Sequence, residues 1–410
     1  MSGTGPQIII VDDDLAMGST AKVLLENAGY RVSLCDSAIR ALEEIPSQRP
    51  ACVLLDIMMP EMDGLELCRR LREKSELRGL KILMFSAKAF KYDRARAAEL
   101  GADGYILKPI NPKTFLDQVR KVVEDKIALT FWGVRGTLPR PGRDSVRYGG
   151  NTNCVTLECP TGPLFILDAG TGIKSLSNHL MARGAQRIEA KILISHPHWD
   201  HINALPFFAP LYITGNDFEI IGADQAGTTV RDFVSAQMDG VYFPITTREF
   251  GARVEFRDLR EGQYQVGSMN VETMLLSHPG NCLGYRLTYR GRSVCYITDN
   301  ELFLPDSGFY APDYADRLTK FVQGAEALIT DVTYTDTEYP RYVGFGHSAV
   351  GPVADLAARA EIGTLYLFHH DPDQDDDAID RKLEDARQRL RDQGSPVVCE
   401  APAEGGSVLV

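Results

Sequence analysis

Apolar residues form short runs separated by amphipathic stretches over the first 125 residues of the chain. Stretches such as Met17–Ala28 and Ile39–Ile45 repeat apolar residues at helical spacing, and Pro112–Lys126 predicts a last helix of this region. The strand-like runs between the helical stretches are Ile8–Val11, Val32–Cys35, Cys52–Leu55, Lys81–Phe85 and Gly104–Leu107. Alternating strands and helices predict an α/β domain with a doubly wound parallel sheet, whose site lies at the carboxyl ends of the strands.

After residue 127 the pattern changes to short strands and glycine-rich turns. The sequence runs through TFWGVRGTLPRPG, RYGGNTNCVTLEC and GPLFILDAGTGI to KILISHPHWDHINALPFF. A chain of 410 residues is too long for one ordinary core, and no flexible linker separates the two patterns. We therefore expect two domains, residues 1–125 and residues 126–410, joined by a stiff junction.

The N-terminal sequence and the cysteines indicate the compartment. MSGTGPQIIIVDDD has no basic start, and carboxylates interrupt its apolar run too early for a signal peptide or a membrane span. The 8 cysteines include no C-x-x-C pair, a pattern typical of buried thiols and not of disulfides or a thiolate zinc site. We therefore expect a cytoplasmic protein without a membrane partner.

The formal net charge is -12, and most of it lies after residue 125. Such an acidic surface repels a phosphate backbone and argues against a nucleic-acid partner. Even so, Arg135, Arg140, Arg143 and Arg147 crowd one glycine- and proline-rich segment. Because arginine suits bidentate phosphate contacts, Arg140 and Arg143 are candidate substrate-binding residues. The alternative is a solvated loop with scattered charge.

Polar residues follow the predicted strands of the first domain at the edge where the site should be. They are Asp12 and Asp13 after the first strand, Asp56 after the third, Ser86 after the fourth and Lys108 after the fifth. Three carboxylates in one pocket cannot all stay ionised without a cation, and oxygen ligands suit Mg²⁺. Capping of the next helix explains the neighbouring Asp14 but not the whole set.

With these motifs in order, the first ~125 residues resemble the bacterial response-regulator receiver. The resemblance implies that Asp56 is the phosphoacceptor and that a cognate sensor histidine kinase is the partner. It also implies roles for the other pocket residues: Asp13 and the Met58 carbonyl bind Mg²⁺ with Asp56, Asp12 acts through water, Ser86 and Lys108 contact the phosphoryl oxygens, and Tyr105 is the switch aromatic.

The second domain contains an H-x-H-x-D-H arrangement after a predicted strand. Alternate residues of an extended loop project to one side, so His196 and His198 can hold one ion while Asp200 and His201 reach a second ion. Imidazole and carboxylate at this density suit zinc, with manganese or iron as alternatives. A lone histidine is usually a hydrogen-bonded core residue, but three histidines and a carboxylate within six residues are difficult to explain that way.

Further candidate ligands and acids follow later strand-like runs. They are His278 in SHPGNC, Asp299 in YITDN, His347 in GFGHSAV, and His369 and His370 in LFHHDP. The acidic stretch Asp371–Asp377 after them predicts a solvated loop and the N-terminal cap of a helix over Ala378–Arg391.

Residues 128–410 resemble the metallo-β-lactamase superfamily, and more closely its phosphodiesterase branch, which includes tRNase Z and the phosphoribosyl cyclic phosphodiesterase. The resemblance implies an αββα sandwich with two Zn²⁺ ions. It assigns His196, His198 and His278 to one ion, Asp200, His201 and His369 to the other, and Asp299 to both. His369 is preferred to His370 because it comes first after the strand.

The predicted function is that of a two-component response regulator with an enzymatic output domain. Asp200 would also orient the attacking water and His347 would protonate the leaving group, although His347 could instead be a packed structural histidine. The expected reaction is hydrolysis of a cyclic or small nucleotide-type phosphodiester, controlled by phosphorylation of Asp56 through relief of occlusion or formation of a homodimer. The alternatives are hydrolysis of a lactam, lactone or thioester, or a non-enzymatic metal-containing sensor or relay.

Overall fold

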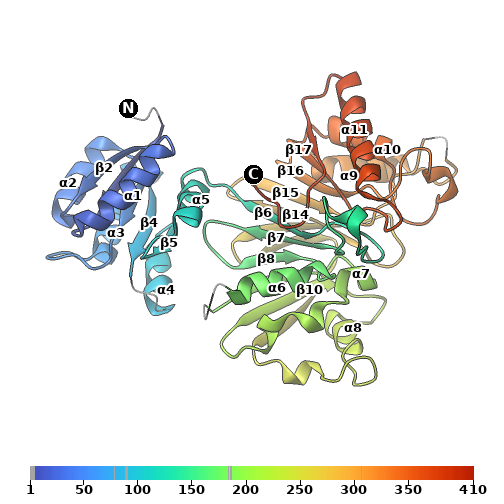
Figure 1. Cartoon of the computed structure of the whole chain (residues 1–410), viewed down its shortest axis with the longest axis horizontal. Coiled ribbons are helices and arrows are strands. Elements are labelled where there is room, and N and C mark those ends of the chain that lie inside the picture. The colour runs from blue at the N-terminus through green and yellow to red at the C-terminus, as the bar shows by residue number, and fades with distance from the viewer. Residues whose placement is uncertain (1–4, 78, 88–90, 183, 185–186, 306) are drawn as a thin grey trace. The chain divides into compact units, whose positions relative to one another are not determined.

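The computed structural model describes residues 5–77, 79–87, 91–182, 184, 187–305 and 307–410 (Figure 1). The chain forms two compact units. The first comprises Met1–Ile127 with Cys159–Thr161, and the second comprises Ala128–Glu158 with Gly162–Val410.

The first unit is built on a five-stranded parallel sheet in the order β2-β1-β3-β4-β5. Its strands are β1 (Gln7–Val11), β2 (Arg31–Cys35), β3 (Cys52–Leu55), β4 (Lys81–Ser86) and β5 (Gly104–Leu107). Its helices are α1 (Leu15–Asn27), α2 (Ala38–Gln48), α3 (Gly64–Glu73), α4 (Lys91–Glu99) and α5 (Pro112–Val123). The predicted doubly wound sheet is confirmed.

Both faces of this sheet are covered by helices. Ile8 and Ile10 of β1 pack in one core cluster with residues of α1 and α5, while Ile9 and Val11 pack in another with residues of α2, α3 and α4. Because side chains alternate between two buried faces, each strand consists almost entirely of apolar residues.

The last helix of the first unit is shorter than predicted. The sequence predicts a helix to Lys126, but α5 ends at Val123. Asp125 has a φ of 51°, the left-handed conformation that terminates a helix, and the amide of Lys126 donates to the Lys121 carbonyl at 3.0 Å. The Asp125 carboxylate forms an ion pair with Lys81, which stabilises this turn.

The second unit contains two seven-stranded sheets. In the order β11-β10-β9-β8-β7-β6-β19, the first sheet contains β6 (Ala128–Gly133), β7 (Cys154–Glu158), β8 (Leu164–Leu167), β9 (Glu189–Leu193), β10 (Asp217–Ala223), β11 (Arg253–Leu259) and β19 (Ser407–Leu409). The second, ordered from β12 to β18 in sequence, contains β12 (Gly262–Val266), β13 (Met269–Leu275), β14 (Leu283–Tyr289), β15 (Arg292–Ile297), β16 (Ala327–Asp331), β17 (Thr364–Phe368) and β18 (Val398–Glu400).

Helices cover the outer face of each sheet of the second unit (Figure 1). The first sheet carries α6 (Gly172–Ala182) and α8 (Val230–Ala236), and the second carries α9 (Pro312–Val322), α10 (Val350–Arg359) and α11 (Asp376–Asp392). The sheets themselves pack together, with the Phe131 ring 5.4 Å from that of Tyr366 and the Tyr285 hydroxyl donating to the Ile194 carbonyl at 2.7 Å. The predicted αββα sandwich is confirmed.

The acidic stretch at the start of α11 differs from its prediction because Gln374 and Asp376 are buried. Asp375 caps the helix by accepting from the Ala378 amide at 2.7 Å, as expected of this stretch. Asp376, however, is buried and lies 3.3 Å from the guanidinium of the fully buried Arg135. The expectation of a solvated loop was therefore wrong at Asp376, because a buried arginine requires a carboxylate partner.

Two features bear on the environment of the protein. All eight cysteines are buried free thiols, as their spacing predicted. Over the described ranges, we find no helix with both the length and the apolar character that crossing a bilayer requires.

Candidate metal centre and receiver pocket

The histidines and carboxylates of the second unit converge because they lie just after strands. The parallel strands β15, β16 and β17 end at one edge of their sheet, and β8 and β9 end together in the other sheet. His196 and His198 follow β9, Asp200 and His201 lie on the one-turn helix α7 (Trp199–Ile202), His278 follows β13, Asp299 follows β15 and His369 follows β17.

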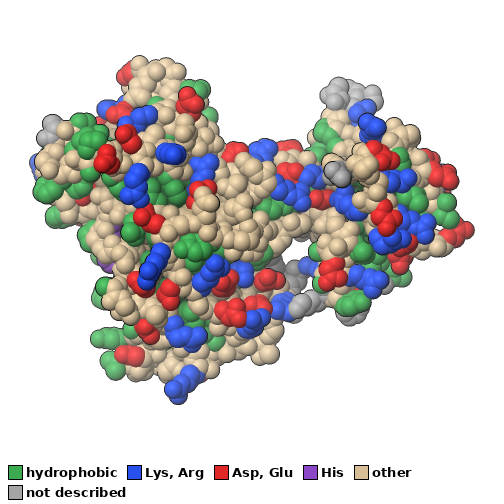
Figure 2. Space-filling view, turned by 180° about the vertical axis from the view of Figure 1, so that it is seen from behind, with side chains coloured by type: hydrophobic (Ala, Val, Ile, Leu, Met, Phe, Trp, Pro, Cys, Tyr) green, Lys and Arg blue, Asp and Glu red, His purple; other side chains and the backbone are tan. Residues whose placement is uncertain are grey.

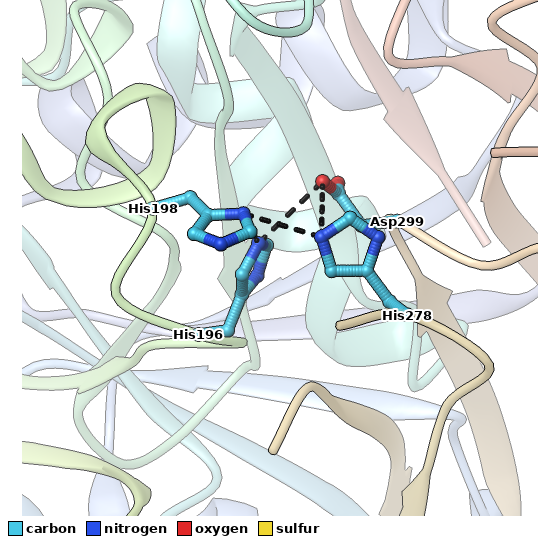
Figure 3. Close-up of side chains that lie close together, drawn as sticks. All are labelled: His196, His198, His278 and Asp299. Carbon is cyan, nitrogen blue, oxygen red and sulfur yellow. Dashed lines mark hydrogen bonds and ion pairs between the residues drawn. The ribbon is translucent and has the colours of Figure 1, made fainter. Parts of the chain in front are cut away.

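The first group of candidate ligands is His196, His198, His278 and Asp299, whose side chains point toward one another (Figure 3). His198 Nδ1 lies 2.8 Å from His196 Nε2 and 3.2 Å from His278 Nε2. Asp299 Oδ2 lies 3.5 Å from His196 Nε2 and 3.7 Å from His278 Nε2.

The second group is Asp200, His201, His369 and Asp299, and all four are buried. Asp200 Oδ2 lies 3.1 Å from Nε2 of both His201 and His369. Asp299 Oδ1 lies 3.2 Å and 3.0 Å from the same two nitrogens. Asp299 therefore directs one oxygen to each group and joins them.

The donor set fits a pair of divalent cations. Ligand atoms about 2.0–2.1 Å from a common tetrahedral centre lie about 3.3 Å apart, close to the separations within each group. The buried carboxylates of Asp200 and Asp299 also require positive charge, which imidazoles alone provide only by binding protons. Nitrogen and oxygen donors without thiolate are typical of zinc, manganese or iron sites.

The second ring nitrogen of three histidines is held by a protein group, so that Nε2 faces the cluster. The contacts are His201 Nδ1 with Asp168 Oδ2 at 2.7 Å, His278 Nδ1 with the Gly346 carbonyl at 3.0 Å and His369 Nδ1 with Thr333 Oγ1 at 3.1 Å. Such contacts fix the orientation and tautomer of metal-binding histidines.

Asp168 organises the centre although sequence reasoning did not select it as a site residue. Its fully buried carboxylate accepts from the Ser195 amide at 2.7 Å, the Ser195 hydroxyl at 2.9 Å and the Tyr296 hydroxyl at 2.8 Å, besides contacting His201. Its sequence signal was the LDAGTG turn directly after a strand.

Two further segments outside the predicted set line the second group. Asn153 is fully buried, with Nδ2 at 3.1 Å from His201 Nε2 and 3.3 Å from Asp200 Oδ2. The Thr137 amide donates to Asp200 Oδ2 at 2.8 Å. Gly136 lies so close to His369 that a Cβ atom there would be 2.0 Å from Cε1 of the imidazole. The GVRG and GGNTNC motifs therefore have a packing role at the cluster.

The protonation preferences also suit cation binding. Burial lowers the pKa of His196, His198 and His278, so these imidazoles are neutral and keep a free electron pair for a metal. Burial also opposes charge on Asp299, yet His369 and His201 hold its pKa well below the usual range. The carboxylates in turn raise the pKa of His201 well above its usual value despite burial, so this ring holds a proton that a metal ion would have to displace.

His347 lies against both groups. Its ring stacks on His369 with centroids 4.9 Å apart and lies 5.3 Å from the His278 ring. Burial lowers its pKa, but the Asp331 carboxylate, 2.7 Å from Nδ1, outweighs burial and raises the pKa to about 9. The side chain is 13% exposed, so a ligand can reach the imidazole here. Asp331 was not singled out from the sequence, where its signal was the strand end LITD.

The remaining candidates of the second unit make other contacts. His370 is fully buried with its ring 6.4 Å from that of Tyr148, and it belongs to neither group, whereas His369 belongs to the second. Arg140 donates to Asp144 at 2.6 Å and to the Pro372 carbonyl. Arg143 is exposed at the start of a short 3-10 helix, Arg143–Ser145.

The first unit brings its three carboxylates together. Oxygen atoms of Asp12, Asp13 and Asp56 lie within 4.8 Å of one another, a spacing that fits a cation with oxygen ligands. Lys108 Nζ lies 2.8 Å from Asp12 Oδ2 and 3.4 Å from Asp56 Oδ1. Burial raises the pKa of Asp56 even though Lys108 opposes the shift.

The other predicted pocket residues lie at neighbouring strand ends. Ser86 is buried at the end of β4, and Tyr105 lies on β5 with its ring 5.2 Å from the Arg94 guanidinium carbon. Met58 follows β3 with an exposed side chain.

Comparison with known proteins matches both units to families. Residues 8–120 match the response regulator receiver domain, and residues 165–370, half of the chain, match the beta-lactamase superfamily domain.

The chain is 36% identical over 135 residues to the response regulator MprA of Mycobacterium ulcerans, covering 30% of this chain and 57% of that protein. It is 32% identical over 117 residues to the transcriptional regulatory protein PhoP of Bacillus subtilis, covering 28% of this chain and 48% of that protein. The chain thus spans about half the length of these curated relatives.

A solved structure resembles the second unit. The metallo-beta-lactamase fold protein YhfI from Bacillus subtilis has a TM-score of 0.51 and 16% sequence identity, covering 70% of this chain and 100% of that chain. This likeness shows the fold alone. The chain therefore belongs to the beta-lactamase superfamily and carries a response regulator receiver domain before its metallo-beta-lactamase fold domain.

Proposed function

We propose that this chain is a response regulator whose output domain is a dinuclear-metal phosphodiesterase. The receiver occupies residues 1–125 and the output domain residues 126–410. The substrate is a cyclic or small nucleotide-type phosphodiester, and phosphorylation of Asp56 controls its turnover. The observation that carries the proposal is His347, whose ring stacks on His369 with centroids 4.9 Å apart and whose Nδ1 lies 2.7 Å from Asp331 Oδ2.

The seven converging side chains would hold two ions, for which zinc is proposed, with manganese or iron as substitutes. His196, His198 and His278 would bind one ion, Asp200, His201 and His369 the other, and Asp299 both. When bound, the ions supply a water nucleophile at neutral pH and stabilise the negative charge that develops on the attacked phosphoryl group.

The chain's own residues position the substrate and move the proton. Asp200, held by the Thr137 amide, faces the cluster and orients the attacking water. Asp331 fixes His347 through Nδ1, which leaves Nε2–H to protonate the departing alkoxide. The alkoxide released from a phosphodiester needs such an acid, which the His347–Asp331 pair supplies; lactam and lactone opening need one as well, so a comparison of bond types has to distinguish these reactions.

The decisive experiment compares bond types with one preparation. Zinc- or manganese-loaded protein is assayed on bis-p-nitrophenyl phosphate, cyclic nucleotides, nitrocefin and an acyl-homoserine lactone. Preferential hydrolysis of phosphodiesters, lost on treatment with a chelator, is expected. Cleavage of the lactam or lactone alone would replace the proposal with the other hydrolase class, and turnover of none of these substrates would favour a metal-containing sensor.

For the receiver we propose Mg²⁺ binding by Asp13, Asp56 and the Met58 carbonyl, with Asp12 acting through water and a sensor histidine kinase as phosphodonor. Lys108 lies where it neutralises an added phosphoryl group. Movement of Ser86 and Tyr105 would carry the signal by relieving occlusion of the metal site or by changing homodimerisation. The protein would act in the cytoplasm.

Nucleic acid fits poorly as a partner of the output domain. On the face shown in Figure 2, the Lys and Arg side chains of the described residues are interspersed with Asp and Glu. A broad basic surface, on which nonspecific phosphate-backbone binding depends, is not formed there by the described residues. The mixed charge of this face, together with the formal net charge of -12, favours a small phosphodiester over RNA or DNA.

A further inference from the structure

Glu301 is a buried carboxylate that holds the loop before His347. It lies two residues after Asp299 and is 2% exposed. Its Oε1 accepts from the Tyr339 hydroxyl at 2.8 Å and from the Gly344 amide at 2.7 Å, and its Oε2 accepts from the Gly346 amide at 2.8 Å. All three donors belong to the segment that leads into His347.

The backbone around Glu301 is itself fixed to the strand end that carries His278. The Glu301 amide donates to the Ser277 carbonyl at 2.9 Å, and the Ser277 amide donates to Asn300 Oδ1 at 3.1 Å. On the other side, the Ser348 hydroxyl donates to the Asn300 carbonyl at 2.5 Å. One short segment thus connects Asp299, the residue before His278 and the residue after His347.

The loop depends on these contacts because it has little regular structure. Between the 3-10 helix Tyr339–Arg341 and α10, Gly344 and Gly346 have φ values of 90° and 86°, in the left-handed region. The Gly346 amide is held by Glu301, and its carbonyl receives His278 Nδ1 at 3.0 Å. A shift of Gly346 would therefore move His347 and release the His278 ring together.

A neutral side chain at residue 301 could not make the same contacts. Two carboxylate oxygens accept from three donors, whereas a glutamine offers one oxygen and would place an NH₂ group against N–H or O–H donors. A buried carboxylate that is contacted by neutral donors costs free energy, because no cation offsets its charge. The presence of Glu301 here therefore indicates that it serves to position the loop.

We infer that Glu301 is a positioning residue for leaving-group protonation. It holds His347 over the ligand groups and, through Gly346, fixes the His278 tautomer that leaves Nε2 free. The inference rests on the proposed phosphodiesterase function for its kinetic consequence, but the clamp itself can be tested without turnover.

The structural test is amide hydrogen exchange on the full, zinc-loaded chain. In Glu301→Gln, the Gly344 and Gly346 amides should exchange at least about tenfold faster, because each loses or weakens its acceptor. Glu338→Gln is the matched control: Glu338 accepts from the Thr335 amide at 2.8 Å at the start of the same loop, and its loss should leave those two amides unchanged. Unchanged exchange in Glu301→Gln would overturn the inference.

The kinetic test varies the leaving group of the phosphodiester. With zinc in excess to keep both ions bound, Glu301→Gln should lower kcat about tenfold for esters of alkyl alcohols, which need a proton donor, and by less than about twofold for p-nitrophenyl esters, with KM preserved. Tyr339→Phe, which removes one of three contacts, should show the same selectivity at smaller size and serves if Glu301→Gln folds poorly.

The outcomes distinguish a failure of the Glu301 inference from a failure of the proposed phosphodiesterase function. An equal loss for every leaving group would mean that Glu301 supports the fold without positioning the acid, and would overturn the inference. If the wild-type protein cleaves no phosphodiester, the proposed function fails, while the exchange result still decides whether Glu301 clamps the loop.

Discussion

Gly136 occupies a position where the backbone of one loop touches the His369 imidazole. Since a Cβ atom there would lie 2.0 Å from Cε1 of the ring, any side chain must displace either the loop or the histidine. The loop also supplies the Thr137 amide that holds Asp200, so it has little freedom to move.

We predict that Gly136→Ala lowers the affinity of the second ligand group for zinc by at least about tenfold, as expected when a ligand loses its orientation. Zinc content after dialysis against a competing chelator should fall from two ions toward one. Gly308→Ala is the control, because a Cβ atom there meets nothing within 4 Å. Equal zinc retention in both variants would contradict the packing role of Gly136.

Lys382 of α11 is fully buried and donates to the carbonyls of Val332 at 2.6 Å and Thr333 at 3.2 Å. Burial lowers its pKa to about 7, from 10.5 for a free lysine. Between these values the unfolded chain binds a proton that the folded chain does not, so stability rises with pH across this window and is lost as pH falls through about 7.

Comparison with Lys382→Met isolates this effect, because methionine fills similar space without titrating. The difference in free energy of unfolding, wild type minus variant, should increase from pH 7 to pH 9. Urea unfolding of chelator-treated protein at several pH values measures it. A difference that does not change with pH would show that the amine keeps its charge in the folded state.

At the scale of elements, the sequence predicted what depends on local pattern. The parallel strands are continuous apolar runs, so β3 and β5 have the predicted ends. The end of α5 was missed because the left-handed turn at Asp125, with its ion pair to Lys81, involves a strand distant in sequence. The burial of Asp376 was missed for the same reason, since Arg135 lies in another part of the chain.

In the candidate site too, residues in a local motif were predicted, and residues whose partners are distant in sequence were missed. Histidines clustered in a short motif were selected directly, and the structure gathers them. Asp168, Asp331 and Glu301 were not selected, because an isolated acidic residue near a strand end does not reveal its partner. Each becomes informative only when the fold brings His201, His347 or a loop amide to it.

A prediction at this scale concerns the start of α1. Asp14 caps the helix by accepting from the amides of Ala16 at 3.0 Å and Met17 at 3.2 Å. Asp14→Ala should lower receiver stability by about 1 kcal/mol, measured by urea unfolding. Asp36→Ala, which removes an exposed ion pair with Arg40, should change stability by less than about 0.5 kcal/mol. Equal effects of the two substitutions would show that Asp14 contributes only surface charge.

At the scale of the whole molecule, the chain combines a response regulator receiver domain with a metallo-beta-lactamase fold domain. Beryllofluoride with Mg²⁺, which mimics the phosphoryl group on Asp56, should change the turnover of a phosphodiester or the oligomeric state of the wild-type chain. Asp56→Asn should keep basal turnover, because the proposed zinc ligands that turnover depends on lie in the second unit. The variant should not respond to beryllofluoride. Turnover assays and size-exclusion chromatography with light scattering measure both effects. A wild-type protein unaffected in both respects would show that the units are not coupled.

Asp168 adds a constraint on how such coupling can operate. Its carboxylate, at the end of β8 in one sheet, is held by the Tyr296 hydroxyl from β15 in the other, and it also orients His201. Asp168 thus connects the candidate ligand His201 to both sheets of the sandwich. Reorienting the His201 imidazole would require breaking hydrogen bonds that hold the two sheets together. We therefore expect phosphorylation to leave the geometry of the candidate ligands unchanged and to control how often a substrate gains access to them.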